Sequence, residues 1–471
     1  MKGRTKPMKR FLSLVLALLM AASMLVLTAC PTEVTPGWQI GETTFDTETP
    51  VTIKFYSTMG KNLIETIDPF LAQFMELYPN ITVEHTQPGG YDEVRDQIKT
   101  ELTVGEQPNI AYCYPDHVAM YNRSGKVITL DQFIDHEIYG LTDAEKADFI
   151  EGFYNEGRQF GDEFMYTLPF SKSTEVLYYN KDVFAKHNLT VPTTWEEMEE
   201  VCRTLKELYP ESTPLGYDSE ANWFITMCEQ YNSGYTSVDE KGNPSYDFDN
   251  ATNREFVKMF AEWHYDGLVT TKELNGAAYT SGLFVEQKSF MSIGSSAGAT
   301  HQRPEAVDGA YPFDVGIAPI PQVDAANNPK VISQGPSLCL LDTGDAQENI
   351  AAWLLMKFLT TNVQLQAAFA DASGYVPVLE SVTEVPAFAA KLEKADGGNN
   401  IAYLSMKVCL EQADYYYTSP AFNGSSTARD QVGYLMQAAM SGYKDAIASG
   451  KVDQLIDKAF KDAINECENQ L

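Results

Sequence analysis

The sequence contains few of the side chains that hold metals or redox centres. Its 471 residues include six histidines and seven cysteines. No two cysteines have C-x-x-C spacing and no two histidines have H-x-x-x-H spacing, so the sequence predicts neither a metal site nor a cofactor. Six of the cysteines are scattered, several among apolar neighbours, as in Leu338-Cys339-Leu340. We expect buried thiols at these positions, while sequence alone leaves an extracytoplasmic disulfide open.

Positive charge is also scarce. The chain has 34 Lys and Arg against 65 Asp and Glu, and five of the basic residues but none of the acidic ones lie in residues 1–29. The remainder of the chain therefore has a formal charge of about −36. Such a surface repels polyanions, which argues against nucleic acid or anionic lipid as a partner. Hydrophobic residues make up 44% of the chain and aromatic residues 12%, enough for a large core and two lobes.

Long apolar runs are missing except for one, from Phe11 to Leu27. A basic stretch precedes it and Thr28-Ala29-Cys30 follows, which is the layout of an export signal. The residues before Cys30 resemble the bacterial lipobox, which implies a signal peptide over residues 1–29 and a diacylglyceryl group on Cys30. Two acyl chains anchor a protein stably, so we expect a lipid-anchored protein on the extracellular face of a Gram-positive cell membrane. A membrane-spanning helix, for which the run is marginal in length, and an ordinary cleaved signal are the alternatives.

The rest of the chain alternates between strand and helix patterns. Residues 30–50 read as a flexible linker rich in Thr, Pro, Glu and Gly. Strands are expected over residues 51–57, 81–85, 109–113, 175–179, 289–293 and 315–321, and helices over 64–78, 92–104, 253–265 and 346–370. Another helix is expected after Thr194, which can form a capping box with Glu197. The alternation predicts an α/β fold with mainly parallel sheets flanked by helices.

Segments rich in Pro and Gly lie near residues 167–172, 318–336 and 373–378. They suit a chain that passes between two lobes more than once, with a hinge between the lobes. We expect a first lobe over residues 51–168, to which residues 333–376 return. The second lobe is expected over residues 169–332, with most of residues 377–471 packed against it.

Several strings resemble, in order along the chain, the family 1 extracellular solute-binding proteins of ABC importers. They are LYYNKDVF at 177–184, PTTWEEM at 192–198, FVEQKSFMSIG at 284–294, AAWLLMKFLTTNVQLQ at 351–366 and GYVPV at 374–378. The resemblance covers nearly all of the chain from Val51 onward. It implies a two-lobed, periplasmic-binding-protein-like fold that closes on a solute and delivers the solute to ABC permease subunits.

Four further strings resemble the glycerol-3-phosphate and sugar-binding subset of that family: YSTMG at 56–60, GGY at 89–91, GYDSEANW at 216–223 and NGSSTAR at 423–429. This resemblance implies ligand contacts at Tyr91, Ser173, Ser295, Gly335, Tyr375 and Arg429. The acidic contact of the subset aligns best with Pro115, and Asp116 is one place away. Tyr235 stands beside the position of a missing Trp, and Lys172 and Glu175 replace small residues. These departures leave both a carbohydrate and a glycerol phosphate open as the ligand.

The aromatic candidates fit a sugar site, because sugars need flat apolar faces for their C–H groups. Tyr56, Tyr91, Trp223, Tyr235 and Tyr375 lie in or beside predicted turns, and core packing is the alternative for each. We include Trp223, with Asp116, among the predicted ligand contacts.

Arg429 lies where a Gly, Ser and Thr-rich stretch opens a predicted helix. A guanidinium beside helix N-terminal amides suits a phosphate or a carboxylate, and we hypothesise that Arg429 favours an anionic group. The alternative is a surface arginine paired with Asp430 or another acid. Lys172, His301 and Arg303 are weaker candidates for binding an anion.

Patterns typical of hydrolases are incomplete. Residues 294–298 match the G-x-S-x-G nucleophile elbow, with Ser296 as the nucleophile. His301 is the only later histidine and no acid separates the two, so a triad lacks its parts. Ser441 and Lys444 match S-x-x-K without its partner motifs, and the 65 acids single out no glycosidase pair.

The sequence therefore predicts a monomeric binding lipoprotein with no catalytic residue. It would capture a carbohydrate or a glycerol-3-phosphate-like polyol between its lobes for an ABC import system. A secreted hydrolase and a sensor or adhesion lipoprotein are the alternatives.

Overall fold

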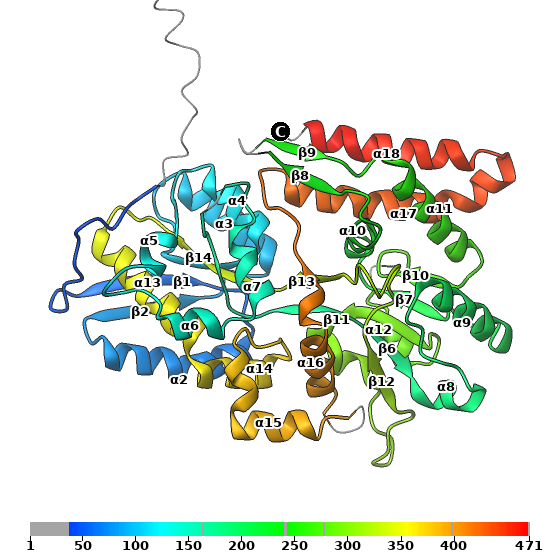
Figure 1. Ribbon diagram of the computed structural model, residues 1–471, viewed down its shortest axis with the longest axis horizontal. Coiled ribbons are helices and arrows are strands. Elements are labelled where there is room, and N and C mark those ends of the chain that lie inside the picture. Colours follow the sequence, from blue (N-terminus) through cyan, green and yellow to red (C-terminus); the bar gives the residue numbers. More distant parts are fainter. Residues whose placement is uncertain (1–36, 163, 240–242, 277, 397–399, 470–471) are drawn as a thin grey trace, which may run out of the picture. The chain divides into compact units, whose positions relative to one another are not determined.

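The computed structural model describes residues 37–469, except for residues 163, 240–242, 277 and 397–399. Residues from Trp38 onward form one compact unit, in which Figure 1 shows two groups of strands surrounded by helices. The expected signal peptide and Cys30 lie outside the described residues and stay predictions. In the part of the chain that is described, no helix combines the length and apolarity that crossing a bilayer requires.

The first lobe is built on a six-stranded sheet with the order β2-β1-β3-β14-β4, and β5 pairs with β14. Its strands are β1 (Val51–Tyr56), β2 (Ile81–Thr86), β3 (Ile110–Cys113), β4 (Val127–Ile128), β5 (Leu168–Pro169) and β14 (Ser337–Leu341). β14 alone runs against the others. In β1, Ile53 and Phe55 are completely buried and Lys54 between them is exposed, which is the alternation expected of a strand.

Helices flank this sheet, and the longer ones present an apolar face to it. In α2, Ile67, Leu71 and Phe74 are buried at helical spacing. α13 packs on β1, and α14 packs on α2. The helices of this part of the chain are α2 (Lys61–Leu77), α3 (Tyr91–Leu102), α4 (Pro115–Asn122), α5 (Asp131–Ile134), α6 (Asp143–Asp148), α7 (Glu151–Asn155), α13 (Ala346–Thr361), α14 (Val363–Ser373) and α15 (Pro386–Glu393).

The second lobe is built on a seven-stranded sheet with the order β10-β7-β11-β6-β13-β15, and β12 pairs with β6. Its strands are β6 (Ser173–Asn180), β7 (Leu215–Tyr217), β10 (Val269–Thr271), β11 (Met291–Ser295), β12 (Val315–Ala318), β13 (Val331–Gln334) and β15 (Tyr416–Tyr417). Here β6 alone runs against the others. Both sheets are therefore mainly parallel, as predicted.

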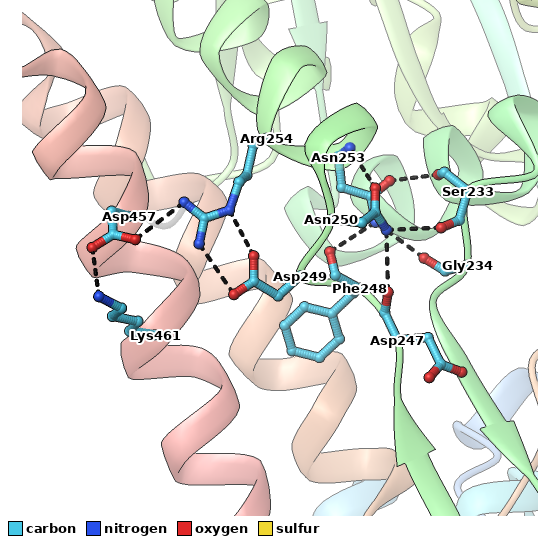
Figure 2. Close-up of polar contacts among 10 residues, drawn as sticks. All are labelled: Ser233, Gly234, Asp247, Phe248, Asp249, Asn250, Asn253, Arg254, Asp457 and Lys461. Carbon is cyan, nitrogen blue, oxygen red and sulfur yellow. Dashed lines mark hydrogen bonds and ion pairs between the residues drawn. The ribbon is translucent and has the colours of Figure 1, made fainter.

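The remaining helices surround the second sheet (Figure 1). They are α8 (Lys181–His187), α9 (Trp195–Leu208), α10 (Glu220–Tyr231), α11 (Ala251–Tyr265), α12 (Ser281–Val285), α16 (Ile401–Glu411), α17 (Ser425–Ser449) and α18 (Val452–Asn469). The predicted capping box of Thr194 and Glu197 begins α9. A hairpin of β8 (Thr236–Val238) and β9 (Pro244–Tyr246) joins α10 to α11. Figure 2 shows the buried amide network that holds the start of α11 to this hairpin region.

The chain crosses between the two sheets through short segments. β5 leads to β6 through residues 170–172, and β13 leads to β14 through residues 335–336. Gly335 has a φ of +95°, and a Cβ there would lie 2.4 Å from the carbonyl oxygen of Ser171, so the turn requires glycine. Lys172 and Val376 exchange backbone hydrogen bonds, which brings a third segment to the same place. Each segment falls in a stretch that its Pro and Gly content marked as a crossing.

The structure differs from the sequence predictions in two places. Part of the expected linker is ordered against the first lobe, because Trp38 stacks on Phe133 and Ile40 is buried in the core. The predicted helix over residues 346–370 is two helices, α13 and α14. Asn362 separates them, and its side chain accepts a hydrogen bond from the Leu365 N–H to cap α14.

Candidate functional site

Two helices of the first lobe begin at the same edge of its sheet. β2 and β3 both run parallel to β1, so their carboxyl ends lie at one edge. α3 starts after β2 at Tyr91, and α4 starts after β3 at Pro115. The rings of Tyr91 and Tyr114 lie 4.7 Å apart. Ligands of open α/β sheets bind outside such an edge.

A cavity of about 450 Å³, here called the cleft cavity, is enclosed between this edge and the second lobe. Tyr91, Tyr114 and Asp116 line it from the first lobe. The second lobe contributes residues 332–334 of β13, Tyr235, residues 418–421 after β15, and Arg429 of α17. Small-molecule sites have volumes of about 300–1,000 Å³ and combine apolar walls with a few polar groups. The cleft cavity fits that description.

Four hydroxyl groups of cleft-lining residues are buried without a hydrogen-bond partner in the described part of the chain. They belong to Tyr235, Ser333, Thr418 and Ser419. A hydroxyl both donates and accepts a hydrogen bond, and leaving one buried and unpaired costs about 1–3 kcal/mol. All four belong to residues that line one cavity, so its wall is rich in hydroxyl groups.

A second cavity of about 740 Å³, here called the side cavity, adjoins the first. Gln334 and Arg429 line both cavities. The walls of the side cavity come mainly from residues 272–302, with contributions from β6, the segment after β7 and the start of α10. They include Glu175, Asp218, Lys272, Ser295 and His301. The wall that the two cavities share therefore carries one cationic side chain.

Hydrogen bonds tie that cation to a buried carboxyl group. The Arg429 guanidinium donates to Oδ1 of Asn222, as does Nε2 of Gln334 at 3.0 Å. Nδ2 of Asn222 donates in turn to Oε1 of Glu175 at 2.8 Å, and the Tyr217 hydroxyl donates to the other carboxyl oxygen. Burial raises the pKa of Glu175 to about 7, although these hydrogen bonds and Arg429 favour its charged form.

Acidic groups predominate around the cleft cavity. Asp92, Asp116, Glu156 and Asp430 line it against two arginines, Arg95 and Arg429. Burial raises the pKa of Asp430, and the nearby Asp116 and Asp92 raise it further despite Arg429. Burial also lowers the pKa of His117, which favours its neutral form. The described residues include no group of three or more His, Cys, Asp and Glu side chains that could hold a metal ion.

The structure brings half of the eight predicted ligand contacts to the cavities. Tyr91 and Asp116 line the cleft cavity, Ser295 lines the side cavity, and Arg429 lines both. Tyr235, the aromatic candidate beside the missing Trp, also lines the cleft cavity.

The other four predicted contacts are not among the residues that line the two cavities. Ser173 and Gly335 flank the wall residue Gln334, the first as its cross-strand partner and the second as its chain neighbour. Tyr375 lies near Tyr91. Burial raises the pKa of Tyr375, and the neighbouring Tyr91 raises it further. Trp223 is completely buried and stacks on Tyr217 at 4.7 Å in the second core. Its role as a ligand contact gains no support from this placement.

Ser296 of the G-x-S-x-G pattern is not placed as a nucleophile. Its side chain is completely buried, and its Oγ accepts a hydrogen bond from the Thr174 N–H at 3.1 Å. A nucleophile elbow needs an exposed hydroxyl with a base beside it. The pattern here serves to join β11 to the turn that follows.

Sequence reasoning missed several residues of the cleft cavity. Tyr114 directly follows β3, so its position between a strand and Pro115 was a usable signal. Thr418 and Ser419 follow β15, a strand of two residues that no periodicity indicates. They reach the cavity only because β15 pairs with β13.

Comparison with known proteins decides the family. A family model of bacterial extracellular solute-binding proteins matches residues 70–395. This chain belongs to that family. Family membership indicates an extracellular or periplasmic location, and it agrees with the resemblance seen in the sequence.

Two curated relatives of this solute-binding protein cover most of its length. The maltotriose-binding protein of Pyrococcus abyssi (strain GE5 / Orsay) is 21% identical over 338 residues, which span 71% of this chain and 68% of that protein. The sn-glycerol-3-phosphate-binding periplasmic protein UgpB of Escherichia coli (strain K12) is 22% identical over 358 residues, which span 74% of this chain and 79% of that protein.

A solved structure supports the fold. The sugar-binding protein MalE from Xanthomonas citri matches this solute-binding protein with a TM-score of 0.69 and 16% identity. The match covers 89% of this chain and 98% of that one. The predicted two-lobed α/β fold is confirmed.

Proposed function

We propose that this protein captures a carbohydrate or a glycerol-3-phosphate-like polyol in the cleft cavity and delivers it unaltered to the permease of an ABC import system. The observation that carries this proposal is the group of four unpartnered hydroxyls around the cavity. Hydroxyl groups on a solute can donate to and accept from such side chains at once. Tyr91, Tyr114 and Tyr235 supply flat faces for the C–H surfaces of the same solute.

Delivery requires a difference between the empty and the loaded protein. In our proposal, residues 51–168 with 333–376 move against residues 169–332 with most of 377–471, and the crossing segments act as the hinge. A solute that contacts both lobes stabilises the closed arrangement, because it binds that state better. The permease would recognise the closed state.

The anchoring of the protein is part of the proposal. Cys30 would carry the diacylglyceryl group that holds a monomer at the extracellular face of a Gram-positive cell membrane. This part depends on the sequence pattern of residues 1–30 alone.

Removing one cavity hydroxyl tests the binding site. Tyr235→Phe deletes a hydroxyl that we place against the solute, while the ring stays. We expect the affinity for the bound sugar to fall by about tenfold, since a good hydrogen bond contributes about 1 kcal/mol or more. Calorimetric titration with maltotriose, maltose, sn-glycerol 3-phosphate and glycerophosphocholine first identifies the solute and then measures the loss.

Tyr121→Phe is the matched control. The Tyr121 hydroxyl is also buried and lacks a partner among the described residues, but it lies in a separate apolar cluster and does not line the cleft cavity. This variant should bind the solute as the wild type does. Equal losses from both substitutions, or no binding to any member of the panel, would contradict the proposal.

A further inference from the structure

Arg429 is the cation on the wall that the two cavities share. The sequence places Arg429 at the start of a helix, which is a favourable binding position for a phosphate. In the structure, the Arg429 guanidinium is already hydrogen-bonded to another side chain of the protein. It donates to Asn222, whose amide group donates to the carboxyl group of Glu175.

Glu175 is buried, and hydrogen bonds hold its side chain in place. Its side chain is 1% exposed, it lines the side cavity, and Tyr217 and Asn222 hold both of its oxygens. Arg429 stabilises the negative charges of both Glu175 and Asp430. One positive charge is therefore shared by two carboxyl groups of the protein itself.

The described lining of the cleft cavity holds one further arginine and no lysine, whereas Lys272 lines the side cavity and lies 3.9 Å from the Glu273 carboxylate. Arg95, the other arginine of the cleft cavity, pairs with Asp92 and Asp96. Lys172 pairs with Glu156, which lines the cleft cavity. At a pH above the Glu175 pKa of about 7, a phosphate ester entering the cleft cavity would meet an arginine whose charge this carboxylate balances, next to the carboxylate of Asp116.

We propose that Glu175 is a specificity-determining residue that neutralises Arg429 from within and makes the cleft select uncharged polyhydroxylated solutes over phosphate esters. The inference rests on the proposed function and narrows its solute class. An uncharged sugar loses nothing to this carboxylate, whereas an anion is repelled by it in a site of low dielectric.

The test measures the affinity for sn-glycerol 3-phosphate at pH 8.5. Glu175→Gln keeps the shape and removes the charge, and we expect the affinity to rise by at least about tenfold, as for removal of one like charge at an effective dielectric of about 20. Binding of maltotriose should change far less. Glu175→Ala is a second variant that removes the charge without requiring glutamine to satisfy the same donors.

Two controls tie the effect to Arg429. Asp453→Asn removes a carboxylate that is 91% exposed and lines neither cavity, so water screens it and the affinity for the phosphate ester should hardly change. Adding Arg429→Ala to Glu175→Gln should abolish the gain.

Three results would overturn the inference. They are a wild type that binds sn-glycerol 3-phosphate as tightly as Glu175→Gln, an absence of anion binding in both Glu175 variants, and a gain that survives Arg429→Ala. Failure of the proposed function is distinguishable, because it would show as no binding of any member of the solute panel to the wild type. The comparison between Glu175 variants does not depend on that result.

Discussion

Glu175 shows how burial and hydrogen bonding compete at a single residue. Burial raises its pKa to about 7 from an ordinary value near 4.5, although Tyr217, Asn222 and Arg429 favour the charged form. Between these two pH values the folded protein holds a proton that the unfolded chain has lost. Stability from this group is therefore present at low pH and is lost as the pH rises through about 7.

The corresponding prediction compares the wild type with Glu175→Gln. The free energy of unfolding of the wild type should fall by about 2 kcal/mol more than that of the variant between pH 5 and pH 8, because only the wild type must ionise a buried carboxyl group. Urea denaturation at both pH values measures the difference. Parallel pH profiles would show that Glu175 titrates normally.

Among the secondary-structure elements, the start of α11 depends on a completely buried amide. Oδ1 of Asn253 accepts from the Ser233 hydroxyl, and its Nδ2 donates to the carbonyl oxygens of Gly234 and Phe248, at 3.0 and 2.8 Å. Asn250 caps the helix beside it. Figure 2 shows these bonds next to an ion-pair chain that runs from Asp249 through Arg254 and Asp457 to Lys461 of α18. The two networks meet at the start of α11 but differ in burial.

That difference gives the second prediction. Asn253→Ala should lower the free energy of unfolding by about 3 kcal/mol, because it leaves buried carbonyl groups without a donor. Lys461→Ala, in the neighbouring chain of Figure 2, should cause no measurable change, because its side chain is 64% exposed and water replaces the ion pair. Denaturant titration of both variants checks the contrast, and a small loss for Asn253→Ala would contradict it.

On the scale of the whole molecule, a buried ion pair lies where the chain passes between the lobes. Lys172 is completely buried, and its Nζ contacts the Glu156 carboxylate and the carbonyl oxygen of Gly335 at 2.9 Å. Ser337 donates to the same carboxylate at 3.1 Å. Two charges and two neutral polar groups from three separate segments therefore satisfy one another at the crossing.

Removing one partner should therefore be costly. Lys172→Met leaves the Glu156 charge buried and uncompensated, and we expect the free energy of unfolding to fall by about 3–5 kcal/mol. Adding Glu156→Gln should restore most of that loss, which thermal and urea denaturation would measure. Lys458→Met, at an exposed pair with Asp462, should change nothing measurable. A double variant no more stable than Lys172→Met would show that the loss comes from packing instead.

Local patterns were sufficient to predict most elements and several cavity residues. The alternation in β1, the buried stripe of α2 and the Thr194 capping box are set by neighbours in sequence, so they could be read directly. The break between α13 and α14 was missed because apolar residues continue through it, and only the cap at Asn362 marks it. Tyr91 and Arg429 were found through strings that resemble a family, whereas Thr418 had no local signal.

The sequence alone determined the α/β class, the crossing segments and the family, because each depends on periodicity or on strings that are contiguous in the chain. Tertiary structure decided what surrounds Arg429. Asn222 and Glu175 lie far from Arg429 along the chain and on other elements, and folding brings their hydrogen-bonding groups within reach of its guanidinium. Electrostatic balance depends on distances through space, which no spacing along a chain specifies.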